Sequence, residues 1–331
     1  MRLGFDVGGT KTDAVVVTPS GEVVARMRRA TGWGADAVVG TILALADDLM
    51  REASLTPADV RSIGVGMPGQ VAAGSTVVTH AVNLGVDALD LGPAVGRALG
   101  APVTAENDVK AAAVGAYALH GAGRAGARAM AYLNLGTGIA AGFVVDGALW
   151  RGVHGTAGEV GHISVDPRGP QCRCGQRGCI EAFSGGGSIA ERWGRPGDLP
   201  VADVFDAADA GDPDAVVLRD GLVYGVASAV RILVLTGDVA SVVVGGGVSA
   251  LGDRLLGRVT ERLETDAADS PFLASLHLAD RLELLPPGSP AAALGAALVS
   301  AANGTRAAGA AVPEADIPEP DISEEKAAIH G

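Results

Sequence analysis

Apolar and polar positions alternate in short blocks along the N-terminal part of the chain, and most blocks end at a glycine or proline turn. Alternating or continuous Val and Ile residues predict strands, whereas apolar positions three and four residues apart predict helices. The predicted elements are, in order, strands over 3–7, 14–17 and 23–28, a helix over 35–53, a strand over 63–67, a helix over 91–99 and a strand over 102–105. Strands and helices that alternate in this way indicate an α/β fold.

The same outline recurs in the second half of the chain. A strand over 129–135, a glycine turn at 136–138 and a strand over 139–146 repeat the pattern of residues 4–21 about 130 residues later. The remaining predicted elements are a strand over 241–244 that enters the glycines 245–247, a helix from residue 252 and a helix over 289–302. Repetition at this scale predicts two related domains that face a cleft.

The length of 331 residues fits two domains of ordinary size. We expect a small α/β domain over 1–117, completed by a C-terminal helix over 289–303, and a large α/β domain over 118–288. Residues 305–331 consist largely of Ala, Pro and acidic residues without apolar periodicity, which predicts a disordered acidic tail.

Composition narrows the class of protein further. Hydrophobic residues make up 48% of the chain and aromatic residues only 3%, and with 49 glycines this indicates tightly packed, turn-rich α/β cores. The net charge of −13 argues against binding to nucleic acid or to an anionic membrane surface. No apolar run reaches the ~18 residues that cross a bilayer, and no secretory signal is visible, so we expect a cytoplasmic protein.

All three cysteines fall close together, as Cys172, Cys174 and Cys179, and His162 precedes them by ten residues. Three thiolates and one imidazole are the ligand set of a closed, tetrahedral structural zinc site. The alternatives are a disulfide with one spare thiol, or buried cysteines without a metal. The odd count of cysteines disfavours the disulfide, so we expect structural Zn²⁺.

Three glycine turns follow predicted strands, and together they indicate a nucleotide held between two lobes. Glycines let backbone amides approach phosphate oxygens closely, although each turn alone is also compatible with simple hairpin chemistry. We expect Asp6 to organise Mg²⁺ through water and Thr10 and Thr137 to donate to phosphoryl oxygens. The candidate ATP-binding residues are Asp6, Gly8, Gly9, Thr10, Lys11, Gly136, Thr137, Gly138, Gly245 and Gly246.

Asn107 and Asp108 end the strand predicted over 102–105. An Asp at this place can accept the proton of an attacking hydroxyl, and the Asn can hold a neighbouring hydroxyl. A plain turn and helix cap is the alternative, because Asx residues are common at caps.

Glu159, His162 and Glu181 flank the cysteine-rich loop. Carboxylates accept paired hydrogen bonds from vicinal hydroxyls, so this group suits a polyhydroxylated substrate. If one ring nitrogen of His162 binds zinc, the direction of the other is fixed, and that nitrogen can donate to a substrate oxygen.

Six motifs together resemble the ROK group (repressors, open reading frames, kinases) over residues 2 to about 303. They are Asp-x-Gly-Gly-Thr-Lys-Thr at 6–12, Pro-Gly at 68–69, Glu-Asn-Asp at 106–108, Leu-Gly-Thr-Gly at 135–138, Glu-x-Gly-His at 159–162 and Cys-x-Cys-Gly-x-x-Gly-Cys-x-Glu at 172–181.

The resemblance implies an actin-like, hexokinase-type fold, with ATP, Mg²⁺ and a hexose in the cleft between two domains, and a homodimer or homotetramer. It implies that Asp108 is the catalytic base and that His162, Cys172, Cys174 and Cys179 bind zinc. The implied sugar-binding residues are Gly69, Asn83, Asn107, Asp108, Glu159, His162 and Glu181.

The chain departs from the usual ROK pattern at Lys110 and Ala116, and it begins directly at the predicted phosphate strand, which disfavours the repressor branch. Ile180 in the cysteine loop is similar to N-acetylglucosamine kinases, and Gly85 stands where an aromatic residue is usual. The predicted reaction is therefore phosphorylation of the 6-hydroxyl of N-acetylglucosamine. Glucose, mannose, glucosamine, N-acetylmannosamine and a non-catalytic sugar sensor remain alternatives.

Overall fold

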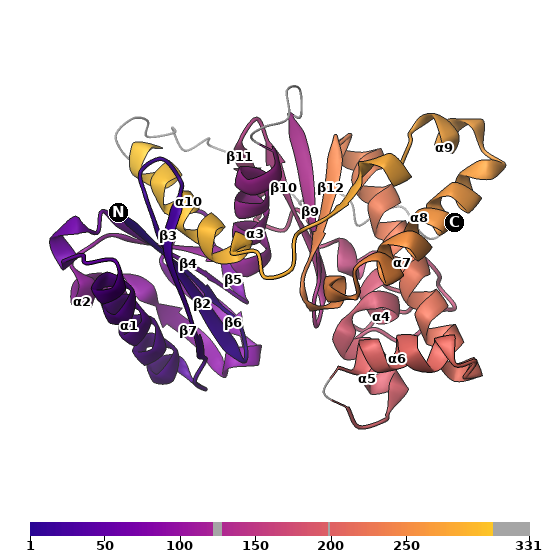
Figure 1. Cartoon of the computed structure of the whole chain (residues 1–331), viewed down its shortest axis with the longest axis horizontal. Helices are drawn as coiled ribbons and strands as arrows, with labels where there is room; N and C mark the ends of the chain where they lie inside the picture. The colour runs from indigo at the N-terminus through magenta and orange to yellow at the C-terminus, as the bar shows by residue number, and fades with distance from the viewer. Residues whose placement is uncertain (122–127, 198, 307–331) are drawn as a thin grey trace, which may run out of the picture.

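The structure is a computed structural model that describes residues 1–121, 128–197 and 199–306. Two five-stranded sheets and a smaller three-stranded sheet form its framework. Figure 1 shows the first sheet on one side of the molecule and the second sheet on the other. The prediction of an α/β fold is confirmed.

The first sheet has the strand order β3-β2-β1-β4-β8. Its strands are β1 (Arg2–Val7), β2 (Lys11–Val17), β3 (Val23–Ala30), β4 (Ser62–Met67) and β8 (Val103–Asn107). Strand β1 pairs antiparallel with β2 and parallel with β4, which in turn pairs parallel with β8. The carboxyl ends of β1, β4 and β8 therefore lie at one edge of the sheet.

The second sheet has the order β11-β10-β9-β12-β13 and repeats these pairings. Its strands are β9 (Ala129–Leu135), β10 (Ile139–Val145), β11 (Ala148–Trp150), β12 (Ser241–Gly245) and β13 (Leu282–Leu284). Strand β9 pairs antiparallel with β10 and parallel with β12. The predicted internal repeat is thus a repeat of topology.

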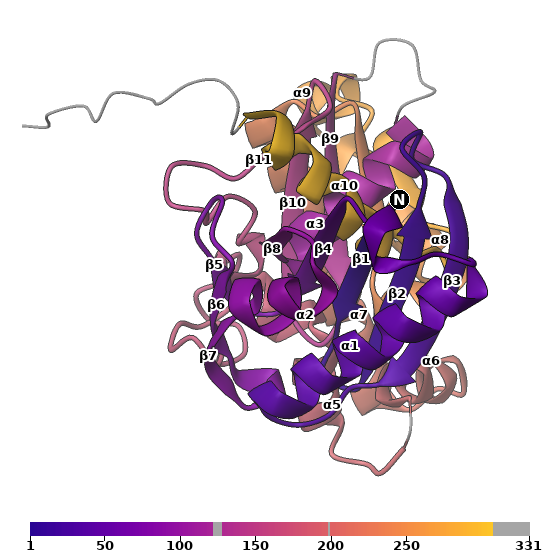
Figure 2. The same cartoon turned by 90° about the vertical axis from the view of Figure 1, so that its left-hand side faces the viewer.

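Helices cover both sheets (Figures 1 and 2). The α-helices are α1 (Ala35–Glu52), α2 (Arg97–Leu99), α3 (Asp108–Ala116), α4 (Ile180–Ser184), α5 (Gly186–Trp193), α6 (Pro200–Asp209), α7 (Pro213–Gly237), α8 (Asp253–Ala268), α9 (Pro271–Ser275) and α10 (Ala291–Arg306). The 3₁₀ and π turns are η1 (Pro57–Asp59), η2 (Val82–Leu84), η3 (Gly92–Gly96), η4 (Tyr117–Gly121), η5 (Val160–His162), η6 (Gly247–Leu251) and η7 (Ala279–Arg281).

Each sheet has its own apolar core. Leu3 and Phe5 of β1 pack with Ile42 and Leu45 of α1, and all four side chains are fully buried. In the second core, β9 and β12 pack with α7, whose long apolar stretch is buried over most of its length. No helix in the described part of the chain is long and apolar enough to cross a membrane.

The C-terminal helix α10 packs on the first sheet and on α3 (Figure 1). Glycines make this close approach possible, because a Cβ added to Gly4 would lie 2.1 Å from the carbonyl oxygen of Ala293. A Cβ on Gly64 would lie 1.8 Å from that of Ala296. Contacts this short exclude any side chain at either position.

The structure differs from the sequence prediction over residues 70–99 and at the short strands β11 and β13, which were not predicted. The helix predicted over 91–99 is a π turn at η3 followed by the short helix α2. Residues 70–90, which were assigned no strand, form the sheet of β5 (Gln70–Val71), β6 (Val77–Ala81) and β7 (Val86–Asp90). The acidic tail predicted over 305–331 lies almost entirely outside the described residues.

Candidate functional site

Two cavities lie between the two five-stranded sheets, and they meet. The first has a volume of about 480 Å³ and is lined by Asp6, Arg28, Tyr132, Gly245 to Gly247 and residues 285–289, among others. The second has a volume of about 450 Å³ and is lined from both halves of the chain. Asp108, Val109 and Asn134 line both cavities. Asp108 is therefore accessible from both cavities.

Strand ends position the two aspartates at this junction. Asp6 lies near the end of β1, and Asp108 begins α3 directly after β8. Burial, reinforced by the nearby carboxylates of Asp108 and Asp13, raises the pKa of Asp6 to about 7. Burial also raises the pKa of Asp108, with a further contribution from Glu159. Two carboxylates with raised pKa values in a cavity indicate a reactive site.

Two arginines of β3 lie near the first cavity: Arg28 lines it, and Arg26 contacts Gly288, which lines it. Burial opposes ionisation of Asp13, but hydrogen bonds from Arg26 and Arg28 outweigh it and lower the pKa of Asp13. Arg26 donates from Nε to Asp13 Oδ1 over 2.9 Å, and it also donates to the carbonyl oxygen of Gly288. The segment that closes the first cavity is thereby tied to the first sheet.

The candidate ATP-binding residues divide between the two cavities. Asp6, Gly8, Gly245 and Gly246 line the first cavity. Thr137 and Gly138 instead line the second cavity. The remaining four candidates, Gly9, Thr10, Lys11 and Gly136, do not line either of these two cavities.

All the residues predicted to bind sugar come together at the second cavity, from segments far apart in the sequence. They are Gly69, Asn83, Asn107, Asp108, Glu159, His162 and Glu181. Glu181 is held in place because its Oε2 accepts a hydrogen bond of 2.9 Å from the backbone N–H of Ile139. The cavity therefore presents carboxylate, amide and imidazole groups to any occupant, which suits a polyhydroxylated molecule.

Asn107 also has the helix-cap role that the sequence left open. Its Oδ1 accepts hydrogen bonds from the backbone N–H groups of Val109 (3.1 Å) and Lys110 (3.2 Å). Its Nδ2 donates to the carbonyl oxygen of Gly69 over 3.3 Å. The side chain is consequently fixed at the start of α3 while it lines the second cavity.

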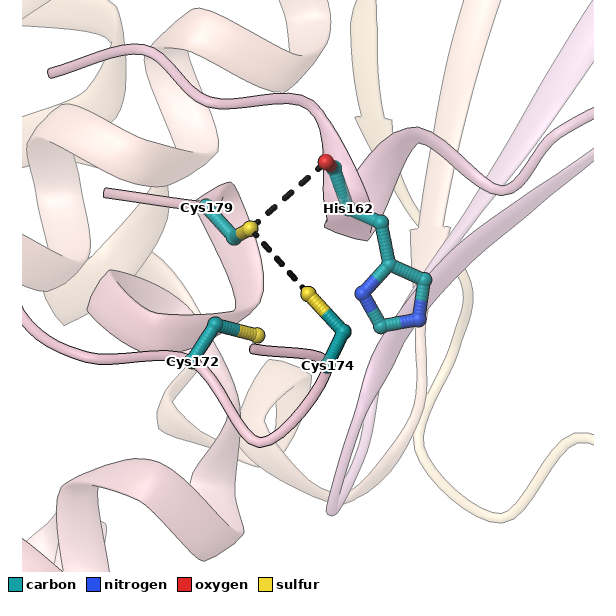
Figure 3. A group of neighbouring side chains, drawn as sticks. All are labelled: His162, Cys172, Cys174 and Cys179. Carbon is teal, nitrogen blue, oxygen red and sulfur yellow. Dashed lines mark hydrogen bonds between the residues drawn. The ribbon is translucent and has the colours of Figure 1, made fainter. Parts of the chain in front are cut away.

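The cysteine-rich loop gathers four potential metal ligands beside the second cavity (Figure 3). One ligand atom from each of His162, Cys172, Cys174 and Cys179 lies within 4.8 Å of all the others. The three cysteines are free thiols, and Cys172 and Cys179 are buried. A compact Cys₃His set of this kind fits tetrahedral zinc.

The thiols differ in acidity. Hydrogen bonds from the backbone and side chain of Gln176 lower the pKa of Cys174 to about 6. Burial raises the pKa of Cys172 and of Cys179. Deprotonation of the two buried thiols therefore requires a compensating charge, which a divalent cation supplies.

Sequence reasoning missed several residues that line the cavities. Tyr132 and Asn134 both line the first cavity, and Asn134 also lines the second. They lie two residues apart at the end of β9, so their side chains share one face of the strand. His80 and Arg173 line the second cavity without any sequence signal that distinguishes them.

The two repeated sheets and the shared site between them define an actin-like fold of the hexokinase type. A family model described as "ROK family" matches residues 2–301. The chain belongs to the ROK family, and the predicted family membership is confirmed.

Several proteins of known name are similar to the chain. It is 33% identical over 284 residues to a glucokinase of Halalkalibacterium halodurans, covering 80% of this chain and 86% of the relative. It is 32% identical over 270 residues to an N-acetylmannosamine kinase of Citrobacter koseri, covering 80% and 89%. The crystal structure of a ROK family glucokinase from Streptomyces griseus, in complex with glucose and AMPPNP, matches with a TM-score of 0.72 at 28% identity, covering 91% and 99%.

Proposed function

We propose that this protein is a kinase that transfers the γ-phosphoryl group of ATP to the 6-hydroxyl of a hexose. One observation carries the proposal: two cavities, one beside glycine turns and one beside carboxylates, meet at Asp108. The names of the relatives, which include glucokinases and N-acetylmannosamine kinases, support the same class of reaction.

The first cavity is the proposed ATP site. Gly8, Gly245 and Gly246 carry no side chain that would keep phosphate oxygens away from the backbone, and the turn at Gly8 is held by a hydrogen bond of 3.0 Å from its N–H to the carbonyl oxygen of Lys11. Asp6 is the proposed carboxylate that holds Mg²⁺ through water, and its raised pKa reflects how poorly a bare carboxylate is accommodated there. When bound, Mg²⁺ offsets the charge that develops on the phosphoryl oxygens.

The second cavity is the proposed hexose site. Glu159 and Glu181 accept hydrogen bonds from sugar hydroxyls, and Asn107 presents its amide beside them. Asp108 accepts the proton of the 6-hydroxyl while that oxygen forms a bond to the γ-phosphorus and the bond to the β-phosphate oxygen breaks. General-base assistance of this kind accelerates reactions by ~10²–10⁴.

Zinc has a proposed structural role next to the hexose. His162, Cys172, Cys174 and Cys179 would hold it, and the metal supplies the positive charge that lets the buried thiols ionise. Because His162 also lines the second cavity, fixing its ring fixes one wall of the hexose site.

The sugar identity remains a prediction. The choice of N-acetylglucosamine relied on Ile180 in the cysteine loop and on free space at Gly85, where an aromatic residue is usual. A Cβ added to Gly85 would lie 2.5 Å from the indole of Trp33, so that indole occupies the space. Because the Gly85 argument is removed and only the Ile180 argument is left, we take glucose as the first candidate, supported by the 33% identical glucokinase, and N-acetylglucosamine as the second.

The test is ADP release from Mg-ATP by zinc-replete protein with glucose, N-acetylglucosamine, N-acetylmannosamine, glucosamine or mannose, compared as kcat/KM. Saturable, sugar-dependent ADP release is the expected result, and the largest kcat/KM names the substrate. If the protein binds a sugar but releases no ADP with any sugar of the panel, the kinase proposal is refuted and the non-catalytic sensor is favoured.

A further inference from the structure

The segment 151–158 connects β11 with η5 and leads directly into Glu159 and His162. Its course is unusual for a surface connection, because polar contacts tie it to the first half of the molecule at two points. Both contacts begin on residues next to Asn107 and Asp108. The loop that delivers one wall of the proposed hexose site is thus joined to the strand and helix that deliver the other wall.

The first tie is an ion pair between Arg151 and Glu106. Arg151 donates to Glu106 Oε2 from Nε (2.8 Å) and from Nη2 (2.7 Å). The second oxygen, Oε1, accepts a hydrogen bond of 3.0 Å from the backbone N–H of Asn107. Glu106 is only 4% exposed, so a carboxylate without its arginine would be left buried and uncompensated.

The second tie is made by Lys110, one of the positions at which the chain departs from the usual ROK pattern. Its Nζ donates to the carbonyl oxygen of Gly155 over 2.7 Å, and the residue is only 6% exposed. Its backbone N–H donates to the Oδ1 of Asn107. A short hydrogen bond from a buried ammonium group is stronger than one between neutral groups.

The other contacts of the loop are mostly with itself, since the backbone N–H of Ala157 donates to the carbonyl oxygen of Arg151 over 3.2 Å. Val153 near its centre is 94% exposed. Gly155 has a φ of 74° and lies next to β5, where a Cβ would be 3.9 Å from the carbonyl oxygen of Val71. The loop rejoins the second sheet only at its end, where the carbonyl oxygen of Gly158 accepts a 2.7 Å hydrogen bond from Ala141.

We propose that Glu106 and Lys110 are positioning residues that fasten the loop 151–158 to the start of α3. In doing so they set Glu159 and His162 at a fixed distance from Asn107 and Asp108. The consequence for sugar affinity rests on the proposed function, whereas the fastening of the loop does not.

Hydrogen exchange followed by mass spectrometry tests the fastening without any substrate. In Lys110→Met we expect the hydrogen-bonded amides of Ala157, Glu159 and Val160, in and directly after the loop, to exchange about tenfold faster or more, because a hydrogen bond to a charged group is lost. Lys110→Arg keeps a cationic donor and should recover much of the protection. Arg128→Met, which removes an exposed partner of Asp146, is the matched control and should leave the loop unchanged.

Steady-state kinetics tests whether loss of these contacts lowers the affinity for the sugar. Lys110→Met should raise KM for the sugar by about tenfold or more and leave KM for ATP nearly unchanged, since the first cavity is not lined by the loop. Glu106→Gln and Arg151→Gln should each raise KM for the sugar too. The double variant should have a sugar KM no higher than that of the more impaired single variant.

Unchanged exchange of the loop in Lys110→Met, in a protein that melts like the wild type, would overturn the proposal. So would a loss confined to kcat, with sugar KM unaffected. If the wild type phosphorylates no sugar, the proposed function fails, yet the exchange experiment still decides whether the loop is fastened. Should Lys110→Met fail to fold, Arg151→Gln provides the same exchange measurement from the other tie.

Discussion

The two five-stranded sheets have the same strand order and pairings, yet their glycine turns have different surroundings. Both turns reach solvent, at Gly9 and Thr10 between β1 and β2 and at Thr137 between β9 and β10, but the second turn also accepts hydrogen bonds from α5. The backbone N–H of Gly186 donates to the carbonyl oxygen of Gly136 over 2.9 Å, and that of Gly187 donates to Thr137 over 3.0 Å. The start of α5 is therefore fastened onto the second turn.

This difference explains how one repeated topology supports two kinds of chemistry. The chain between β11 and β12 contains the cysteine loop and α4 to α7, and it places Glu181 beside Gly138. The first turn is approached by η2 instead, where a Cβ added to Gly9 would lie 3.2 Å from the carbonyl oxygen of Asn83. The first half supplies Asp6 and Asp108, and the second half supplies most of the carboxylate and imidazole groups of the second cavity.

Replacement of the carboxylate at the junction should have the largest effect. We expect Asp108→Asn to lower kcat by ~10²–10⁴, because the amide cannot accept the hydroxyl proton. Sugar binding, measured by calorimetry, should persist because the two side chains have nearly the same shape. Asp146→Asn removes an exposed carboxylate elsewhere and is the control. Near-full turnover of Asp108→Asn would exclude it as the base.

Substitution of a cysteine in the cysteine-rich loop of the second half should have the next largest effect. In Cys174→Ser we expect zinc affinity to fall by more than about 100-fold, since a ligand matters more than its outer partners. Sugar affinity should fall with it, because His162 loses its fixed orientation. Metal analysis and sugar titration check both, with chelated and zinc-reloaded wild type as controls. Unchanged zinc content in the variant would contradict the Cys₃His assignment.

The buried carboxylate of the first half predicts a dependence of stability on pH. The folded-state pKa of Asp6 is about 7, above its ordinary value of 3.8. The charged form is therefore disfavoured in the folded protein, and stability is lost as pH rises through about 7. Asp6→Asn should melt like the wild type near pH 4 and be more stable at pH 8 by on the order of 1–3 kcal/mol.

Thermal unfolding without added magnesium measures that difference. A gain in stability of Asp6→Asn at pH 8 is specific to a raised pKa of Asp6. If ion pairs stabilised the carboxylate instead, the variant would be less stable than the wild type at pH 8. An Asp6→Asn protein whose stability relative to wild type is the same at pH 4 and pH 8 would show that Asp6 is not desolvated.

The smallest effect separates the two turns directly. Thr137 lines the second cavity, whereas Thr10 lines neither of the two. We expect Thr137→Ala to raise KM for the hexose or for ATP by about 2- to 12-fold, as for the loss of one neutral hydrogen bond. Thr10→Ala should change KM less. Equal effects of the two substitutions on ATP affinity would instead support the sequence prediction that both threonines donate to phosphates.

Much of the fold was predictable because most strands of the two large sheets are five to eight residues long and largely apolar, whereas the three-residue strands β11 and β13 were missed. The predicted strand over 129–135 agrees residue for residue with β9, and the helix predicted over 35–53 differs from α1 by one residue. The sheet of β5 to β7 was missed because its strands are two to five residues long and carry no clear alternation.

The site was partly predictable for a related reason. Residues in recognisable motifs, such as Glu159 and Glu181, come together at the second cavity. Asn134 was missed because the importance of its position depends on which cavity each strand end faces, and only the pairing of β9 with β12 sets that. The contact of Trp33 with Gly85 joins residues 52 positions apart, and no local pattern announces it.

The central claim is that a hydroxyl in the second cavity attacks a phosphoryl group in the first, past Asp108. The most direct measurement compares ADP release with the preferred hexose and with its 6-deoxy analogue, each at saturating concentration with Mg-ATP. The account predicts that the 6-deoxy sugar competes with the hexose for binding and releases no ADP above the sugar-free background. Equal ADP release with both sugars would contradict transfer to the 6-hydroxyl.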